Sequence, residues 1–159
     1  LAAIKDALTD GTQKVQLSGS LSQLSKVTSD SASIVAVGTT EYISFVASGT
    51  NLARLVDIGL YVPAVSGATS GTHTLYVALG ISGGSYDRLW QRSAAYNVSI
   101  SCNTNSLLFE SNTALGAILG GIVFSANLPI RIAYDNQTNA AQEGQRRYRI
   151  VKLEGGVPW

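Results

Sequence analysis

The chain is a succession of short apolar runs, each closed by a cluster of Gly, Ser, Asn or Thr. The run at residues 53–62 ends at Pro63, which cannot donate a hydrogen bond to a β-ladder. Residues 73–80 alternate Leu and Val with Thr, Tyr and Ala, which is the period of two that a half-buried strand requires. No long helical pattern separates the runs, so the sequence argues against parallel βαβ units.

The pattern predicts an all-β fold of about eight to ten strands, arranged as an antiparallel β-sandwich of jelly-roll type, because stacked sheets hide most strand edges. The turn at residues 66–71 suggests that residues 73–80 form a hairpin with residues 53–62. Leu1, Ile4 and Leu8 share one helical face, which predicts a short N-terminal helix.

The sequence predicts that the chain is divided into two regions. Residues 1–33 are expected to form the N-terminal helix and a linker or arm with short edge strands, and residues 34–159 the β-sandwich domain. Because the chain starts with Leu1 and contains no methionine, we expect it to be one piece of a longer polypeptide.

Charged residues make up only 13% of the chain, against a usual share of about 25%. The surface must therefore be covered by neutral polar side chains, as is typical of extracellular β proteins and virion parts. A net charge of +1 argues against nucleic acid as a partner. The one basic cluster, Arg146, Arg147, Arg149 and Lys152, would alternate between the two faces of a strand.

Two further features limit the function. Cys102 is the only cysteine, so it has no intrachain disulfide partner, and we expect a small buried residue there. The longest apolar stretch, residues 114–124, is well short of the ~20 residues that span a bilayer, so no membrane insertion is expected.

Residues 80–84 match the Gly-x-Ser-x-Gly pattern that presents Ser82 as a nucleophile in some hydrolases. That motif needs a following helix and a later histidine, whereas residues 86–90 read as a strand and His73, the only histidine, comes earlier. The favoured interpretation is a glycine-rich hairpin turn, with His73 as a surface or half-buried strand residue. A serine hydrolase centred on Ser82 and His73 is kept as the least favoured alternative.

No catalytic residues, cofactor or metal site are expected. The acidic residues are scattered, and the oxygen-rich segment 135–139 lacks the glycine and terminal glutamate of a helix-loop-helix calcium site. A turn held by Asx-type side-chain hydrogen bonds explains this segment better.

A candidate sugar-binding patch lies at Tyr86, Asp87, Trp90 and Arg92, which combine aromatic faces with charged hydrogen-bonding groups. Strand alternation would place Tyr86, Arg88 and Trp90 on one face, and Asp87 on the other. The competing interpretation is that Trp90 packs in the core.

The segment Leu-Pro-Ile-Arg-Ile-Ala-Tyr-Asp-Asn-Gln-Thr-Asn-Ala-Ala-Gln at residues 128–142, followed by Arg-Tyr-Arg-Ile at residues 147–150, resembles the closing hairpin of structural proteins of tailed bacteriophages. Residues 2–8 and 14–20 are similar to the segment that precedes such domains. In place of the threonine expected soon after Gln142, this chain has Glu143-Gly144-Gln145. No catalytic residues come with the resemblance.

The resemblance implies a virion component on the particle surface, on tail or head, present in several copies. The leading hypothesis is therefore a non-enzymatic phage structural protein that contacts other virion proteins and assembles as a homo-oligomer, with a trimer expected, through the N-terminal helix and an apolar sheet face. The alternative is a carbohydrate-binding module that recognises a host cell-surface glycan. The two coincide if the attachment target is a sugar.

Overall fold

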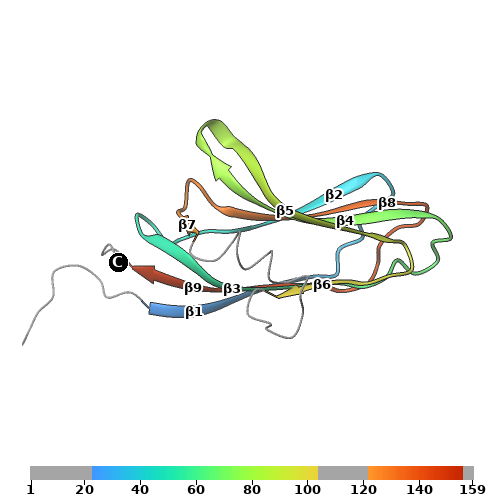
Figure 1. Ribbon diagram of the computed structural model, residues 1–159, viewed down its shortest axis with the longest axis horizontal. Coiled ribbons are helices and arrows are strands. Elements are labelled where there is room, and N and C mark those ends of the chain that lie inside the picture. Colours follow the sequence, from blue (N-terminus) through green and yellow to red (C-terminus); the bar gives the residue numbers. More distant parts are fainter. Residues whose placement is uncertain (1–22, 104–121, 156–159) are drawn as a thin grey trace, which may run out of the picture.

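The structure is a computed structural model in which residues 23–103 and 122–155 are described. These residues form two antiparallel sheets packed face to face (Figure 1). One sheet has the strand order β1-β9-β3-β6 with β7 also paired to β3, and the other has the order β2-β8-β4-β5. The strands are β1 (Gln23–Ser31), β2 (Thr39–Phe45), β3 (Leu52–Val62), β4 (Gly71–Ile81), β5 (Ser85–Ala95), β6 (Ile100–Asn103), β7 (Val123–Phe124), β8 (Ile130–Thr138) and β9 (Arg146–Gly155).

The pairing is nested, as if one long hairpin had been rolled up. β4 pairs with β5, β3 with β6, β2 with β8 and β1 with β9, so partners lie progressively further apart in the chain. Two further pairings, β3 with β9 and β4 with β8, join these units into the two sheets. This is the jelly-roll arrangement. The predicted all-β jelly-roll sandwich is therefore confirmed, while the predicted N-terminal helix lies outside the described residues.

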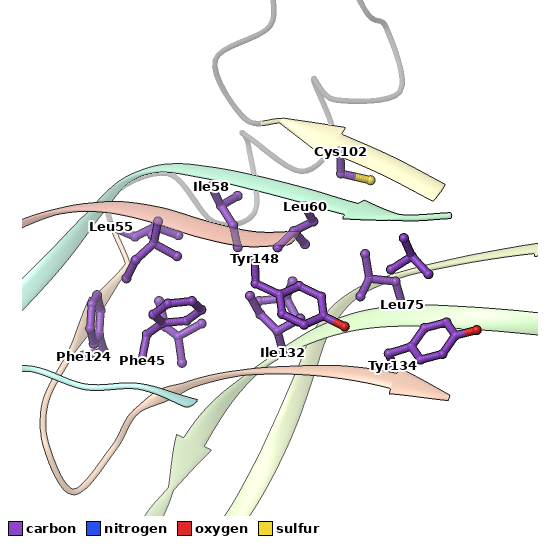
Figure 2. Packing of buried hydrophobic residues seen from close by; sticks show 14 of the residues in the cluster. Phe45, Leu55, Ile58, Leu60, Leu75, Cys102, Phe124, Ile132, Tyr134 and Tyr148 are labelled. Carbon is purple, nitrogen blue, oxygen red and sulfur yellow. The ribbon is translucent and has the colours of Figure 1, made fainter. Parts of the chain in front are cut away.

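The core fills the space between the sheets and comes mainly from alternate residues of the strands, with a change of phase in β3 at the bulge between Leu55 and Asp57. Leu55 and Ile58 from one sheet face Leu75 and Ile132 from the other, and all are almost fully buried (Figure 2). The inward and outward alternation that the sequence shows is what places these side chains on the shared inner faces.

The prediction that β3 and β4 form a hairpin was wrong. β3 lies in one sheet and pairs with β9, β6 and β7, whereas β4 lies in the other sheet between β5 and β8. The connection at residues 63–70 carries the chain across the sandwich, held by the buried Val65, whose N–H donates to the carbonyl of Tyr96 at 2.7 Å. An alternating strand buries every second side chain whether its neighbour pairs with it in the same sheet or lies across the core in the other sheet. Alternation alone therefore could not distinguish a β3–β4 hairpin from the observed arrangement.

The segment interpreted as a helix and linker with edge strands contains one long strand of the sandwich. β1 is nine residues long and pairs with β9 from Gln23 opposite Glu154 to Ser31 opposite Arg146. The sandwich therefore already includes residue 23.

The tip of the β4–β5 hairpin is the glycine-rich turn at Ser82–Gly84, a single 3-10 turn. Gly83 and Gly84 have φ values of +83° and +78°, a backbone region that other residues rarely adopt. The hairpin bends away from the rest of the sandwich (Figure 1). A β-bulge accompanies the bend: Val77 is opposite Trp90 and Ala78 is opposite Arg88, so Leu89 is the extra residue of β5.

Candidate functional site

The bulge in β5 places the residues of the predicted sugar-binding patch on opposite faces of the sheet. Beyond Leu89 the alternation changes phase, so Trp90 lies opposite the core residue Val77, while Tyr86 lies opposite Gly80 on the outer face. Tyr86 and Trp90 are therefore on opposite faces, which contradicts the predicted shared face. The prediction assumed an uninterrupted strand, and nothing in the local sequence marks the extra residue.

The other patch residues also separate. Trp90 is partly buried and packs against the core, as the competing interpretation proposed. Asp87 is opposite Leu79 on the inner side near the hairpin tip, and Arg92 donates from Nη1 to the carbonyl oxygen of Ser101 in β6 at 3.4 Å. Of the four residues, only Tyr86 joins a cluster on the solvent face of the sheet.

That cluster, which we call the tyrosine–arginine face, consists of Tyr42, Tyr76, Tyr86, Arg88 and Arg131. The Arg131 guanidinium lies 3.5 Å from the centre of the Tyr86 ring and 4.4 Å from that of Tyr42. The Arg88 guanidinium lies 4.0 Å from the centre of the Tyr76 ring. Each contact is within the range of a cation–π interaction.

Small residues on the same face allow these long side chains to lie flat. Ala133 is flanked by Tyr42 and Tyr76 on the neighbouring strands, and Ala78 by Arg131 and Arg88. Both alanines point outward, yet they are 0% and 2% exposed. The tyrosine and arginine side chains therefore cover them and form an ordered layer on the outside of the sheet.

The positive charge of this layer has no ion-pair partner within the described residues. The ion pairs found there involve Arg146 and Lys152, and both lie elsewhere. Arg88 donates to the neutral Gln91 side chain at 2.7 Å. The Nε atom of Arg131 is buried and, among the described residues, has no hydrogen-bond acceptor.

Tyr76 lies at the centre of the tyrosine–arginine face. Burial and a hydrogen bond with Tyr42 raise the pKa of the Tyr76 phenol, and the charges of Arg88 and Arg131 act against this rise. The Tyr76 phenol therefore stays neutral at physiological pH and lies beside two guanidinium groups.

The residues of the hydrolase alternative do not meet. His73 is near the start of β4 and Ser82 follows its end, and nine extended residues span roughly 30 Å. Residues 85–95 after the turn form a strand, not the helix that the nucleophile motif needs. The interpretation of residues 80–84 as a hairpin turn is confirmed.

His73 is fully buried, which corrects the expectation of a surface or half-buried residue. Its Nε2–H donates to the carbonyl oxygen of Val98 at 2.7 Å, which leaves Nδ1 to accept from the Tyr134 hydroxyl at 3.1 Å. Burial lowers the pKa of His73, despite backbone hydrogen bonds to Val98 and Ala95 that raise it. The imidazole is therefore a neutral, fully engaged structural group.

The segment that resembles phage proteins is a buried hydrogen-bond scaffold. Asn136 donates to the carbonyls of Val35 and Ala140, and its Oδ1 accepts from the backbone and hydroxyl of Thr138. Gln142 donates to the carbonyl of Pro63 at 2.9 Å. The expected Asx-type bonds are therefore present, but the expected turn is not, because residues 135–138 continue strand β8. The polar residues of the segment hold the end of β8 to three loops.

A second buried network joins the two sheets. Glu41 of β2 pairs with Arg146 of β9 through two bonds, at 2.8 and 3.0 Å, and also accepts from Tyr148 and Ser31. Burial would raise the pKa of Glu41, but the hydrogen bonds from Arg146, Ser31 and Tyr148 outweigh it and hold the pKa below its ordinary value. This is a buried ion pair whose lone pairs are satisfied.

The basic cluster alternates as expected. Arg146 and Lys152 are buried and bind internal acceptors, whereas Arg147 and Arg149 lie on the other side of β9. Cys102 is also buried, and burial raises the pKa of its thiol. In the described part of the chain, no group of His, Cys, Asp and Glu is placed to hold a metal ion, and no helix is long and apolar enough to cross a membrane.

The sequence missed Tyr42, Tyr76 and Arg131 as surface-site residues. Each alternates with core residues and therefore points outward, which was the available signal. The register that brings β2, β8, β4 and β5 together was not readable from local patterns.

Comparison with known proteins adds no relative: no family model, curated protein or solved structure matches the chain.

Proposed function

We propose that this chain is a non-enzymatic structural component of a tailed bacteriophage virion, displayed on the surface of the head or tail. One observation carries the proposal: the segment that resembles phage proteins, residues 128–142, closes a jelly roll through its own side chains. Asn136, Thr138 and Gln142 are all buried and hydrogen bonded, so the resembling residues hold the end of β8 and its connection to β9. These two strands lie in different sheets and do not form the hairpin that the resemblance implied. Jelly rolls occur in viral capsid and lectin domains, which agrees with the proposal by analogy.

The polar chemistry of the chain supports a structural role. His73, the only histidine, uses both ring nitrogens in internal hydrogen bonds. Glu41 and Arg146 neutralise each other between the sheets. The residue types that most often act as acids and bases are in these cases occupied in holding the fold together.

The virion role is tested by labelling purified particles of the phage that encodes the chain with an antibody raised against the recombinant protein. Gold label on head or tail in electron micrographs would support the proposal and would decide between the two locations. Particles that carry none of this chain, by labelling and by mass spectrometry after disruption, would refute it.

We propose that copies of the chain assemble, as a homotrimer, and contact other virion proteins. Exposed apolar side chains on the five-stranded sheet support this: Leu24 is 66% exposed, and Leu52 and Val123 are 45% exposed. A low charge content also weakens repulsion between copies. Light scattering at micromolar concentration should give three times the chain mass, and a strict monomer would contradict assembly.

The second candidate function is recognition of a host cell-surface glycan, and the tyrosine–arginine face favours it. Aromatic rings and charged donors lie together there in an ordered, outward layer, which suits carbohydrate hydroxyl groups and C–H faces. A glycan array tests this function: binding should disappear in Tyr42→Ala and persist in Tyr61→Ala, a half-exposed tyrosine of the other sheet. If the wild-type chain binds no glycan on the array, this function is wrong.

A further inference from the structure

The charge of the tyrosine–arginine face indicates which class of sugar it would accept. We propose that it binds a carboxylated saccharide, such as a uronic-acid chain, whose carboxylate is received by Arg131 and Arg88. The inference rests on the glycan-recognition function proposed above and adds the substrate class and the residues.

The first argument is the state of Arg131. Two rings lie against its guanidinium, from Tyr86 at 3.5 Å and from Tyr42 at 4.4 Å. These ring contacts restrict the guanidinium, whose planar set of N–H donors suits bidentate binding of an anion. The buried Nε has no acceptor among the described residues, so the group is partly desolvated without an internal anion. A carboxylate is the planar anion that matches such a fork.

The second argument is the spacing of the two cations. Arg131 and Arg88 lie on strands that flank β4, both opposite Ala78, so their backbones are about 10 Å apart. Within the described residues neither has a carboxylate partner, in a chain whose net charge is only +1. Two like charges this close favour an anionic ligand, and a neutral sugar would leave them uncompensated.

The third argument is that the face is already ordered. Ala78 and Ala133 are buried under the layer although they face outward, so these side chains have given up much of their freedom before any ligand arrives. A ligand then loses less of its binding free energy to ordering the protein. Tyr42, a residue that is 52% exposed, leaves ring surface for the apolar face of a sugar.

The experiment is calorimetric titration of the full chain with tetragalacturonate, with its fully methyl-esterified form, and with a phosphate-bearing glycan of equal length. We expect binding of the acid, and Kd at least tenfold weaker for the ester. Arg131→Gln should weaken binding of the acid roughly tenfold to a hundredfold, the usual effect of losing hydrogen bonds to a charged group. Arg147→Gln, which removes an exposed arginine from the other sheet, should leave Kd unchanged.

Each outcome decides a separate point. Equal binding of acid and ester, or preference for the phosphate glycan, would overturn this inference but leave glycan recognition standing. Failure to bind these probes or any array glycan would overturn the proposed recognition itself. If thermal melting shows that Arg131→Gln does not fold, Arg88→Gln and the salt dependence of the wild-type Kd provide the test, since binding through two guanidinium groups must weaken as salt rises.

Discussion

At the scale of single residues, the interior of the sandwich is held by polar groups that come from distant parts of the chain. Glu41 and Arg146 are 105 residues apart in sequence and meet between the sheets. His73 and Tyr134, 61 residues apart, form part of a hydrogen-bond chain that continues to Gln142. These groups make the stability of the fold sensitive to single substitutions and to pH.

Replacing Glu41 by Gln should destabilise the protein by about 3–5 kcal/mol, because it leaves the Arg146 charge buried without its anion. Urea denaturation measures this as a lower midpoint with an unchanged slope. The double variant Glu41→Leu with Arg146→Met should lose less than the sum of the single losses, because no charge is then left in the interior. Additive losses would contradict the pairing.

The free energy of unfolding should fall as the pH drops below about 6.5, the ordinary pKa of histidine. Burial lowers the pKa of His73 in the folded protein. Between pH 6.5 and that lowered pKa, His73 is protonated in the unfolded chain but neutral in the folded chain, so protonation favours unfolding. Urea titrations at pH 7.5 to 5 measure this loss. The His73→Gln variant should be less stable at every pH, but its free energy of unfolding should not change between pH 7.5 and 5.

The carboxylates of Glu41 and Glu154 lose their contribution to stability in a lower pH range than His73 does. Hydrogen bonds hold the pKa of Glu41 below 4.5 and that of Glu154 at about 2, against the rise that burial alone would cause. Their stabilisation is complete above pH 4.5 and is lost only at lower pH. A pH dependence between 7.5 and 5 that survives in His73→Gln would refute the assignment to His73.

At the scale of elements, the connections decide which strands pair. The apolar run at residues 53–62 and the alternation at residues 73–80 correctly identified β3 and β4 as strands, but not the sheet to which each belongs. The connection between β3 and β4 ends at Gly71, whose φ is +95° and whose position is opposite Thr138. There the backbone of β8 passes so close that a side chain has no room.

Gly71→Ala should therefore destabilise the protein by more than Gly67→Ala in the same connection. Both glycines have a positive φ, so both substitutions carry a strain of about 1–2 kcal/mol. The methyl group at 71 would in addition overlap the Gln137 carbonyl oxygen, whereas at 67 it would meet open space. Thermal melting of both variants provides the measurement, and equal losses would contradict the close approach.

At the scale of the whole molecule, the nested pairing makes the outermost strands the most distant in sequence. Residue 23 lies opposite residue 154, so closing β1 on β9 requires most of the chain to be in place. Contacts of this range are slow to form because the entropy of closing the loop is lost before they are made.

Refolding should consequently take milliseconds to seconds, as in other β-sandwiches, and not microseconds. Stopped-flow fluorescence of the buried aromatic groups after dilution from urea would follow it. A substitution in β1 such as Val27→Ala, whose side chain packs against the core, should mainly speed unfolding if β1 pairs last. If the substitution instead slowed folding by as much as it lowered the stability, β1 would belong to the folding nucleus.

Local sequence patterns were enough to predict the fold class, the hairpin turn at residues 80–84, the buried cysteine and the alternation of the basic residues in β9. The fold class, the turn and the alternation depend on local periodicity or glycine conformation, and the buried cysteine on the usual preference of a free thiol for the interior. The partners of β3, the burial of His73 and the residues that make up the tyrosine–arginine face could be known only from the folded chain. Register and bulges are set by packing between strands far apart in the chain, so Tyr42, Arg131 and Tyr86 become neighbours only when the sheet has formed.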